Sequence, residues 1–169
     1  MTGCSSLRVA VYDPKSRQDY AMETKAAYTK SPVYKEHAIK AAITQSAEEY
    51  IGTPYRYGSC DAGKGFDCSG LVYTVAKSHH LTLPRSSSLM ASTGDHIPWK
   101  KAEQGDLIFF GDHSKINHVG IIETNKGNQM WVIHSTTSSG VVKEDVLASD
   151  YWRKRILFAV DIVDQKTKS

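Results

Sequence analysis

The chain has 169 residues, of which 40% are hydrophobic and 23% are charged, a composition typical of one globular domain with a real core. Its formal net charge is +3 and its basic residues are scattered. The one basic run, Arg153-Lys154-Arg155, favours a solvated face over a nucleic-acid patch. No apolar run approaches the roughly 18 residues that a membrane-spanning helix needs. We therefore expect one domain with a loose leader and no nucleic-acid partner. A monomer is our expectation for the oligomeric state, on which no sequence pattern bears.

The first six residues resemble the end of a bacterial lipoprotein signal. In Thr2-Gly3-Cys4 a small residue and a glycine precede a cysteine, which is the lipidated position in such signals. The apolar segment of a signal does not precede them, so we interpret Met1 as a start placed inside the signal; the alternative is a chance Thr-Gly-Cys. We expect a lipid on Cys4 that anchors the chain in the cell envelope, on the periplasmic side of the outer membrane.

The pattern of the sequence changes near residue 37. Residues 5–36 are polar and show no sustained periodicity, which is typical of a tether. From His37 to Ile51 the apolar residues fall on one helical stripe, which Gly52 and Pro54 end. We predict a flexible tether over residues 1–36, a folded domain over 37–164 and a tail over 165–169.

The stretch from Gly65 to Tyr73 brings Cys68 to the first turn of a predicted helix. Glycines signal a turn before it, and apolar residues at helical spacing follow it as far as residues 77–80. Unpaired N–H groups and the positive end of the helix dipole lower the pKa of a thiol in this position. Cys68 is thus placed for chemistry, and an inert, buried cysteine is the alternative.

In the second half of the chain, the sequence pattern indicates mainly strands. A loop over residues 81–88 leads into a short helix through Leu89 and Met90. Short apolar or alternating runs bounded by Gly, Asn and Asp then indicate strands at 106–110, 118–122, 130–134 and 155–160. Helices first and antiparallel strands after them, without alternation, indicate an α+β fold.

Two histidines lie on neighbouring predicted strands. His118 opens one strand and His134 closes the next, so antiparallel pairing makes them neighbours. Cysteine catalysis needs a base near the thiol and a polar group that orients the base. A lone histidine on an apolar strand is more often a hydrogen-bonded core residue. The competing arrangement is a zinc site with Asp112, His113 and both histidines, but paired ligand motifs are missing, so we expect no metal or cofactor.

Other polar groups near the thiol have two interpretations each. Tyr55 or Tyr57 can supply a hydroxyl to the oxyanion of an acyl transfer, together with the backbone N–H of Cys68, or can simply pack. Asp67 can bind a substrate amine or cap the helix, and the sequence favours capping.

Three cysteines are an odd number. With Cys4 as an anchor and Cys68 as a nucleophile, Cys60 has no partner, which argues against a disulfide framework. A Cys60–Cys68 disulfide stays open as an alternative, and it would block the reactive thiol.

Six segments occur in a recognisable order: Thr53–Gly58, Gly65–Val72, Leu83–Ser87, Gly105–Phe110, His118–Ile121 and His134–Val141. In this order they resemble the signature segments of the NlpC-type cell-wall cysteine peptidases, and most of all those of the Spr-type lipoprotein murein endopeptidases. The resemblance covers about residues 38–163.

The resemblance implies a papain-like α+β fold, with helices packed against a central antiparallel sheet and the nucleophile at a helix N-terminus. Cys68 would be the nucleophile, His118 the base and His134 the residue that orients the base. Tyr55 matches the oxyanion tyrosine of the family. The residues implied to shape the pocket for the peptide stem are Asp67, Ser69, Arg85 and Ser86.

The implied function is a peptidoglycan endopeptidase that cuts an amide bond in stem peptides or their cross-links, with the D-alanyl–diaminopimelate bond favoured. The alternatives are cleavage between D-glutamate and diaminopimelate, an acyltransferase on the same scaffold, and a non-catalytic module that binds the cell wall. One departure is Ser59, where the family usually has a second glycine. Its side chain is expected to narrow the cleft or alter the loop, which affects substrate preference.

Overall fold

We describe a computed structural model that covers residue 25, residues 28–112 and residues 115–163. Cys4 and most of the predicted tether lie outside the described residues. The compact unit that carries the sheet begins at Glu36. No helix within the described ranges is both long and apolar enough to cross a membrane.

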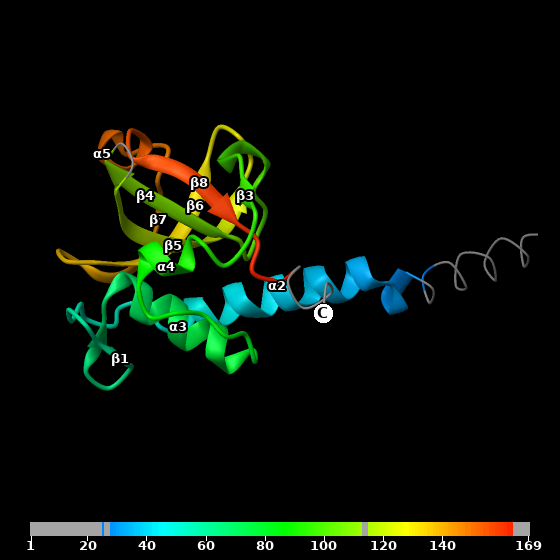
Figure 1. The fold of residues 1–169 in the computed structure, drawn as a ribbon, viewed down its shortest axis with the longest axis horizontal. Coiled ribbons are helices and arrows are strands. Elements are labelled where there is room, and N and C mark those ends of the chain that lie inside the picture. The colour runs from blue at the N-terminus through cyan, green and yellow to red at the C-terminus, as the bar shows by residue number, and fades with distance from the viewer. Residues whose placement is uncertain (1–24, 26–27, 113–114, 164–169) are drawn as a thin grey trace, which may run out of the picture. The chain divides into compact units, whose positions relative to one another are not determined.

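A six-stranded antiparallel sheet forms the centre of this unit, with the strand order β3-β8-β4-β5-β6-β7 (Figure 1). The strands are β3 (His96–Ile97), β4 (Leu107–Asp112), β5 (Lys115–Asn125), β6 (Met130–Thr136), β7 (Gly140–Asp145) and β8 (Ile156–Val160). A separate antiparallel pair joins β1 (Cys60–Asp61) to β2 (Gly65–Phe66). The four predicted strands are confirmed as β4, β5, β6 and β8, whereas β7 and the two-residue strands β1, β2 and β3 were not predicted.

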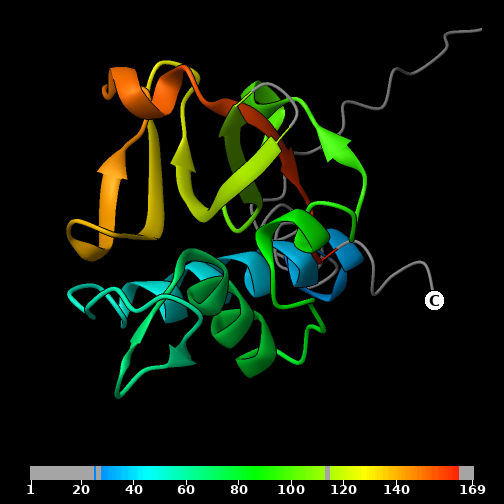
Figure 2. The same cartoon turned by 60° about the vertical axis from the view of Figure 1, so that its left-hand side comes forward.

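The helices are α2 (Pro32–Glu48), α3 (Cys68–Ser78), α4 (Ser87–Met90) and α5 (Asp150–Arg153), with a 3-10 turn η1 (Trp99–Lys101). From Glu36 on, α2 lies with α3 on one side of the sheet (Figures 1 and 2). We expected the first helix over residues 37–51, but it begins at Pro32, inside the predicted tether, and ends at Glu48. Proline is favoured at a first helical position because its missing N–H has no partner there in any case.

The sheet separates two apolar cores. Along β4, Leu107 and Phe109 belong to the core on the helix side, while Ile108 and Phe110 belong to the core on the other side. Successive residues of a strand point to opposite faces, so a strand covered on both faces must be apolar throughout. The antiparallel sheet, with α2 and α3 on one face, confirms the predicted α+β fold, and α3 packs against β5.

Candidate active site

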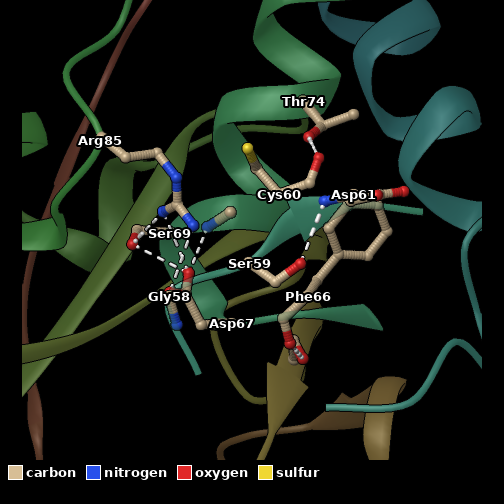
Figure 3. A network of polar contacts seen from close by, with 11 residues as sticks. Gly58, Ser59, Cys60, Asp61, Phe66, Asp67, Ser69, Thr74 and Arg85 are labelled. Carbon is tan, nitrogen blue, oxygen red and sulfur yellow. Dashed lines mark hydrogen bonds and ion pairs between the residues drawn. The ribbon is translucent and has the colours of Figure 1, made fainter. Parts of the chain in front are cut away.

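Cys68 is the first residue of α3, and Asp67 caps the helix in front of it. The Asp67 carboxylate accepts hydrogen bonds from the backbone N–H of Gly70 at 2.6 Å and of Gly58 at 2.8 Å. Arg85 donates to both carboxylate oxygens, at 3.1 and 3.2 Å (Figure 3). The favoured prediction that Asp67 caps the helix is therefore confirmed, and this one side chain fixes both the helix start and the preceding loop.

The loop before the nucleophile approaches α3 closely at Gly70. A Cβ at Gly70 would collide with the Ser59 carbonyl oxygen, which accepts the Asp67 N–H at 3.2 Å. Ser59 itself causes no backbone strain, because His80 is the one described non-glycine residue with a positive φ. Its hydroxyl accepts the Asp61 N–H at 3.3 Å. Ser59 therefore sits in the loop without left-handed strain, and its expected effects on the cleft and on the loop's backbone angles stay predictions.

Burial dominates the environment of the Cys68 thiol. It raises the pKa of the thiol, the Asp67 charge adds to this effect, and the backbone N–H groups of Val119, Ser69 and Cys68 act against it. The net pKa lies above the ordinary value. The lowered pKa predicted from the helix N-terminus is therefore wrong for the resting thiol, because burial outweighs the N–H groups. Cys68 is a neutral thiol that needs a base.

His118 on β5 and His134 on β6 are neighbours, as antiparallel pairing predicted. Nε2 of His118 lies 2.9 Å from Nδ1 of His134. Burial, together with the charge of His134, lowers the pKa of His118 to about 3. His118 is therefore neutral near pH 7 and can accept a proton. The next residue, Val119, contacts the Cys68 thiol through its N–H, so the base stands beside the nucleophile.

Two aromatic side chains enclose the histidine pair. The Trp152 ring stacks on His118 with a centroid distance of 4.7 Å and lies 4.9 Å from the ring of His134. Phe110, which is fully buried, contacts both imidazoles from β4. This apolar enclosure is what disfavours a charge on His118.

A further contact of the histidine pair was not predicted. Oε1 of Glu144 on β7 lies 2.7 Å from Nε2 of His134 and accepts the Trp152 indole N–H at 3.0 Å. The strand register pairs His134 with Val142 and Val132 with Glu144, so Glu144 is the diagonal neighbour of His134. In the sequence, Glu144 is only a carboxylate in a short run after Gly140. Its proximity to His134 follows only from the register of β6 and β7.

A cavity of about 680 Å³ opens beside the thiol, and Tyr55, Cys68 and His118 all line it. Its other lining residues are Asn117, Ser135–Ser139, Val142–Glu144, Tyr151 and Trp152. Burial and the charges of Cys68 and nearby groups raise the pKa of Tyr55, so its hydroxyl stays protonated and can donate a hydrogen bond. Tyr57 is 89% exposed and is not among the lining residues.

The other predicted pocket residues make contacts within the protein instead. Ser69 donates to Asp67 at 3.1 Å and accepts from Arg85 at 3.0 Å. Ser86 is the N-cap of α4 and accepts the Leu89 N–H at 3.4 Å. Asp67, Ser69, Arg85 and Ser86 do not line the cavity, so their contact with a peptide stem stays a prediction.

Cys60 and Cys68 are both free thiols, so the alternative disulfide between them does not form. In the part of the chain that the structure describes, no three His, Cys, Asp or Glu side chains gather as ligands of a metal ion. His113, one member of the alternative zinc site, lies outside the described residues.

Residues 52–161, which include the capped Cys68 and both histidines, match the NlpC/P60 family. The chain belongs to the NlpC/P60 family. The family predicted from six ordered segments is therefore confirmed, and the match covers the sheet and all the residues that line the cavity.

Curated relatives within this family share about a third or more of the matched residues. The protein named "Probable endopeptidase NlpC" from Escherichia coli (strain K12) is 41% identical over 119 residues, 69% of this chain and 73% of that protein. "Murein DD-endopeptidase MepS/Murein LD-carboxypeptidase" of the same strain is 36% identical over 118 residues, 69% of this chain and 60% of that protein. "Gamma-DL-glutamyl hydrolase" of Bacillus subtilis (strain 168) is 32% identical, over 68% of this chain and 27% of that protein. The chain thus spans only part of the longer relatives.

Solved structures of the family share the fold. The NlpC/P60 domain of the peptidoglycan hydrolase SagA has a TM-score of 0.60 and 32% identity, covering 72% of this chain and 97% of that one. A Staphylococcus aureus protein described as similar to lipoprotein, of the NLP/P60 family, has a TM-score of 0.61 and 28% identity, covering 75% of this chain and 42% of that one. The predicted papain-like α+β fold is confirmed.

Proposed function

We propose that this protein is a peptidoglycan endopeptidase that uses Cys68, His118 and His134. One observation carries the proposal: in a domain of the NlpC/P60 family, the Cys68 thiol shares a cavity with His118, and His118 is hydrogen-bonded to His134. Relatives named murein endopeptidase and gamma-DL-glutamyl hydrolase support the substrate class.

The reaction starts from a neutral thiol and a neutral imidazole. The thiol proton passes to His118 as the sulfur attacks the amide carbonyl, so a C–S bond forms while the carbonyl becomes an oxyanion. The Tyr55 hydroxyl and the Cys68 backbone N–H donate hydrogen bonds to that oxyanion. His118 then gives its proton to the nitrogen, the C–N bond breaks, and an amine leaves.

Water completes the cycle. It attacks the thioester while His118 accepts one of its protons, and the C–S bond then breaks as the proton returns to sulfur. The products are a free carboxyl and the regenerated thiol. His134 keeps the imidazole of His118 in one orientation through both steps.

For the bond that is cut, we favour the D-alanyl–diaminopimelate cross-link. Relatives named "Murein DD-endopeptidase" support this choice. The second candidate is the bond between D-glutamate and diaminopimelate within one stem, which relatives named "Gamma-DL-glutamyl hydrolase" and "Bifunctional muramidase/DL-endopeptidase CwlT" support.

We also propose a place of action in the cell envelope. Relatives named murein endopeptidases support an envelope enzyme. The finer proposal, a monomer attached to the periplasmic face of the outer membrane by a lipid on Cys4, rests on Thr2-Gly3-Cys4.

Digestion of purified sacculi, with mass analysis of the released fragments, tests the activity and the bond together. We expect Cys68→Ala and His118→Ala to release no fragments. Cys60→Ala is the matched control, because it removes an exposed thiol that does not line the cavity, and it should act like wild type. Fragments with a free diaminopimelate amine and an intact stem indicate the cross-link, whereas split stems indicate the glutamyl bond. Unchanged digestion by both active-site variants would end the proposal.

A further inference from the structure

A chain of hydrogen bonds runs from His118 through His134 to the carboxylate of Glu144. We propose that Glu144 is a positioning residue that holds His134, and through it His118, in the tautomer that proton transfer needs. The inference rests on the proposed function, because it gives Glu144 a part in the same proton transfer.

With His134 in its neutral form, the donors and acceptors along this chain allow one assignment. A carboxylate only accepts, so His134 must donate from Nε2 to Oε1 of Glu144 at 2.7 Å. A neutral imidazole has one N–H, which leaves Nδ1 of His134 as an acceptor. Nε2 of His118, 2.9 Å away, must then be the donor. The lone pair of His118 is therefore on Nδ1, where it can accept the thiol proton.

Glu144 is well placed to remain ionised. The hydrogen bond from His134 lowers its pKa most, burial acts against this, and the charge of His134 and the Trp152 indole N–H lower the pKa further. When His118 accepts a proton, a cation forms inside the enclosure of Trp152 and Phe110. The carboxylate at the end of the chain offsets that cation without a contact to His118 itself.

Other titratable groups line the cavity next to His118. Cys68 comes from α3, Tyr55 from the loop before it, and Tyr151 from α5. Lys143, next to Glu144 on β7, is paired with Glu48 at 2.8 Å. The comparison of variants must therefore change Glu144 while leaving these groups as they are.

Two substitutions of Glu144 separate the effect of its hydrogen-bond acceptor from the effect of its negative charge. Glu144→Gln keeps an oxygen that can accept from His134 and Trp152 but has no charge. Glu144→Leu removes both. Glu123→Gln is the matched control, because Glu123 is a half-exposed glutamate on β5 that acts on Lys143 and does not contact the histidines.

Nitrogen NMR of histidine-labelled protein reads the tautomers without any substrate. We expect the Nε2–H form for both His118 and His134 in wild type and in Glu144→Gln. In Glu144→Leu, we expect His134 to gain the Nδ1–H form, which can donate to His118 and reverse its tautomer. An Nδ1–H form of His134 in wild type would overturn the inference.

Kinetics on cross-linked muropeptides separate positioning from substrate binding. We expect kcat to fall by about 10- to 100-fold in Glu144→Leu and by less in Glu144→Gln, with KM nearly unchanged. The acidic limb of the pH profile should move to lower pH in Glu144→Gln, because loss of the negative charge makes His118 harder to protonate. A raised KM with unchanged kcat would make Glu144 a substrate contact and overturn the inference.

Alkylation of Cys68 by iodoacetamide keeps this test independent of the proposed function. Peptide-resolved mass spectrometry follows Cys68, with the exposed Cys60 as an internal reference. We expect slower alkylation of Cys68 in Glu144→Leu and no change in Glu123→Gln. If wild type fails to digest sacculi while these tautomer and alkylation results hold, the proposed function fails and the positioning role stands. Equal alkylation in all variants would overturn the positioning role.

Discussion

At the residue scale, burial acts in opposite directions on the two reacting side chains. It raises the pKa of Cys68 and lowers the pKa of His118, so each is held in its neutral form. Proton transfer creates both charges together in one cavity, where each stabilises the other more strongly than in water. The site therefore keeps the thiol unreactive until a proton can move to His118.

Tyr55 provides a prediction at this scale, because its ring and its hydroxyl have separable roles. Tyr55→Phe keeps the packing against the loop and removes one donor to the oxyanion. We expect kcat to fall by roughly 100- to 1,000-fold with KM changed little, measured on isolated muropeptides. Tyr57→Phe, at an exposed ring outside the cavity, is the matched control. Similar losses in both variants would contradict the assignment.

At the element scale, features with local causes could be predicted from the sequence. The helix that starts at Cys68 has its cap residue and its apolar face within eleven residues. β4 is apolar from Leu107 to Phe110 because both of its faces are covered there. The neighbouring positions of His118 and His134 followed from antiparallel pairing alone.

Features that depend on register or on distant packing could not be predicted. β7 has few apolar residues and a charged end, so its sequence lacks the pattern of a strand. Because β7 was not predicted, the contact of Glu144 with His134 was not predicted either. The raised thiol pKa was missed because Cys68 packs against a core that includes strands far along the chain. Helix capping was local and predictable, whereas desolvation was not.

Asp67 gives a prediction for the element that carries the nucleophile. Asp67→Ala removes the cap of α3 and leaves two backbone N–H groups and Arg85 without their acceptor. Loss of a cap costs about 1 kcal/mol, and the unpaired groups add to that cost. We expect the free energy of unfolding, measured by urea denaturation, to fall by about 2 to 3 kcal/mol.

The control for Asp67 is another aspartate in an exposed ion pair. Asp61 pairs with Lys64, and its side chain is 51% exposed. Asp61→Ala should change the free energy of unfolding far less than Asp67→Ala does, because water screens an exposed ion pair. Equal effects of the two substitutions would show that the hydrogen bonds of Asp67 stabilise the fold no more than an exposed ion pair does.

At the scale of the whole folded unit, a buried lysine joins α2 to the sheet. The Lys40 ammonium lies 3.0 Å from Asp106, just before β4, and 2.5 Å from Asp161, just after β8. Glu36 on the same helix is 3.3 Å away. Lys40 is only 4% exposed. No sequence pattern distinguished this lysine from the surface lysines, because its burial depends on where the two strand ends meet α2.

The ion pairs of Lys40 with Asp106 and Asp161 make the free energy of unfolding depend on pH in the alkaline range. Burial alone would lower the pKa of Lys40, but hydrogen bonds and charges from Asp161 and Asp106 raise it above its ordinary value of 10.5. The unfolded chain therefore loses this proton first as the pH rises. The stabilisation is complete below about pH 10.5 and declines above it, because the folded state then binds more protons than the unfolded state.

Lys40→Met tests this contribution. It leaves the buried Asp106 carboxylate without its cation, so we expect the free energy of unfolding at pH 7 to fall by about 3 to 5 kcal/mol. Urea denaturation near pH 7, 9 and 11 should give the same difference from wild type at the first two values. Above about pH 10.5 that difference should shrink by about 1.4 kcal/mol per pH unit. Lys143→Met, at the partly exposed pair with Glu48, should lower stability by less than about 1 kcal/mol. A Lys40→Met difference that stayed constant up to pH 11 would mean that Lys40 stabilises the fold through packing and not through its charge.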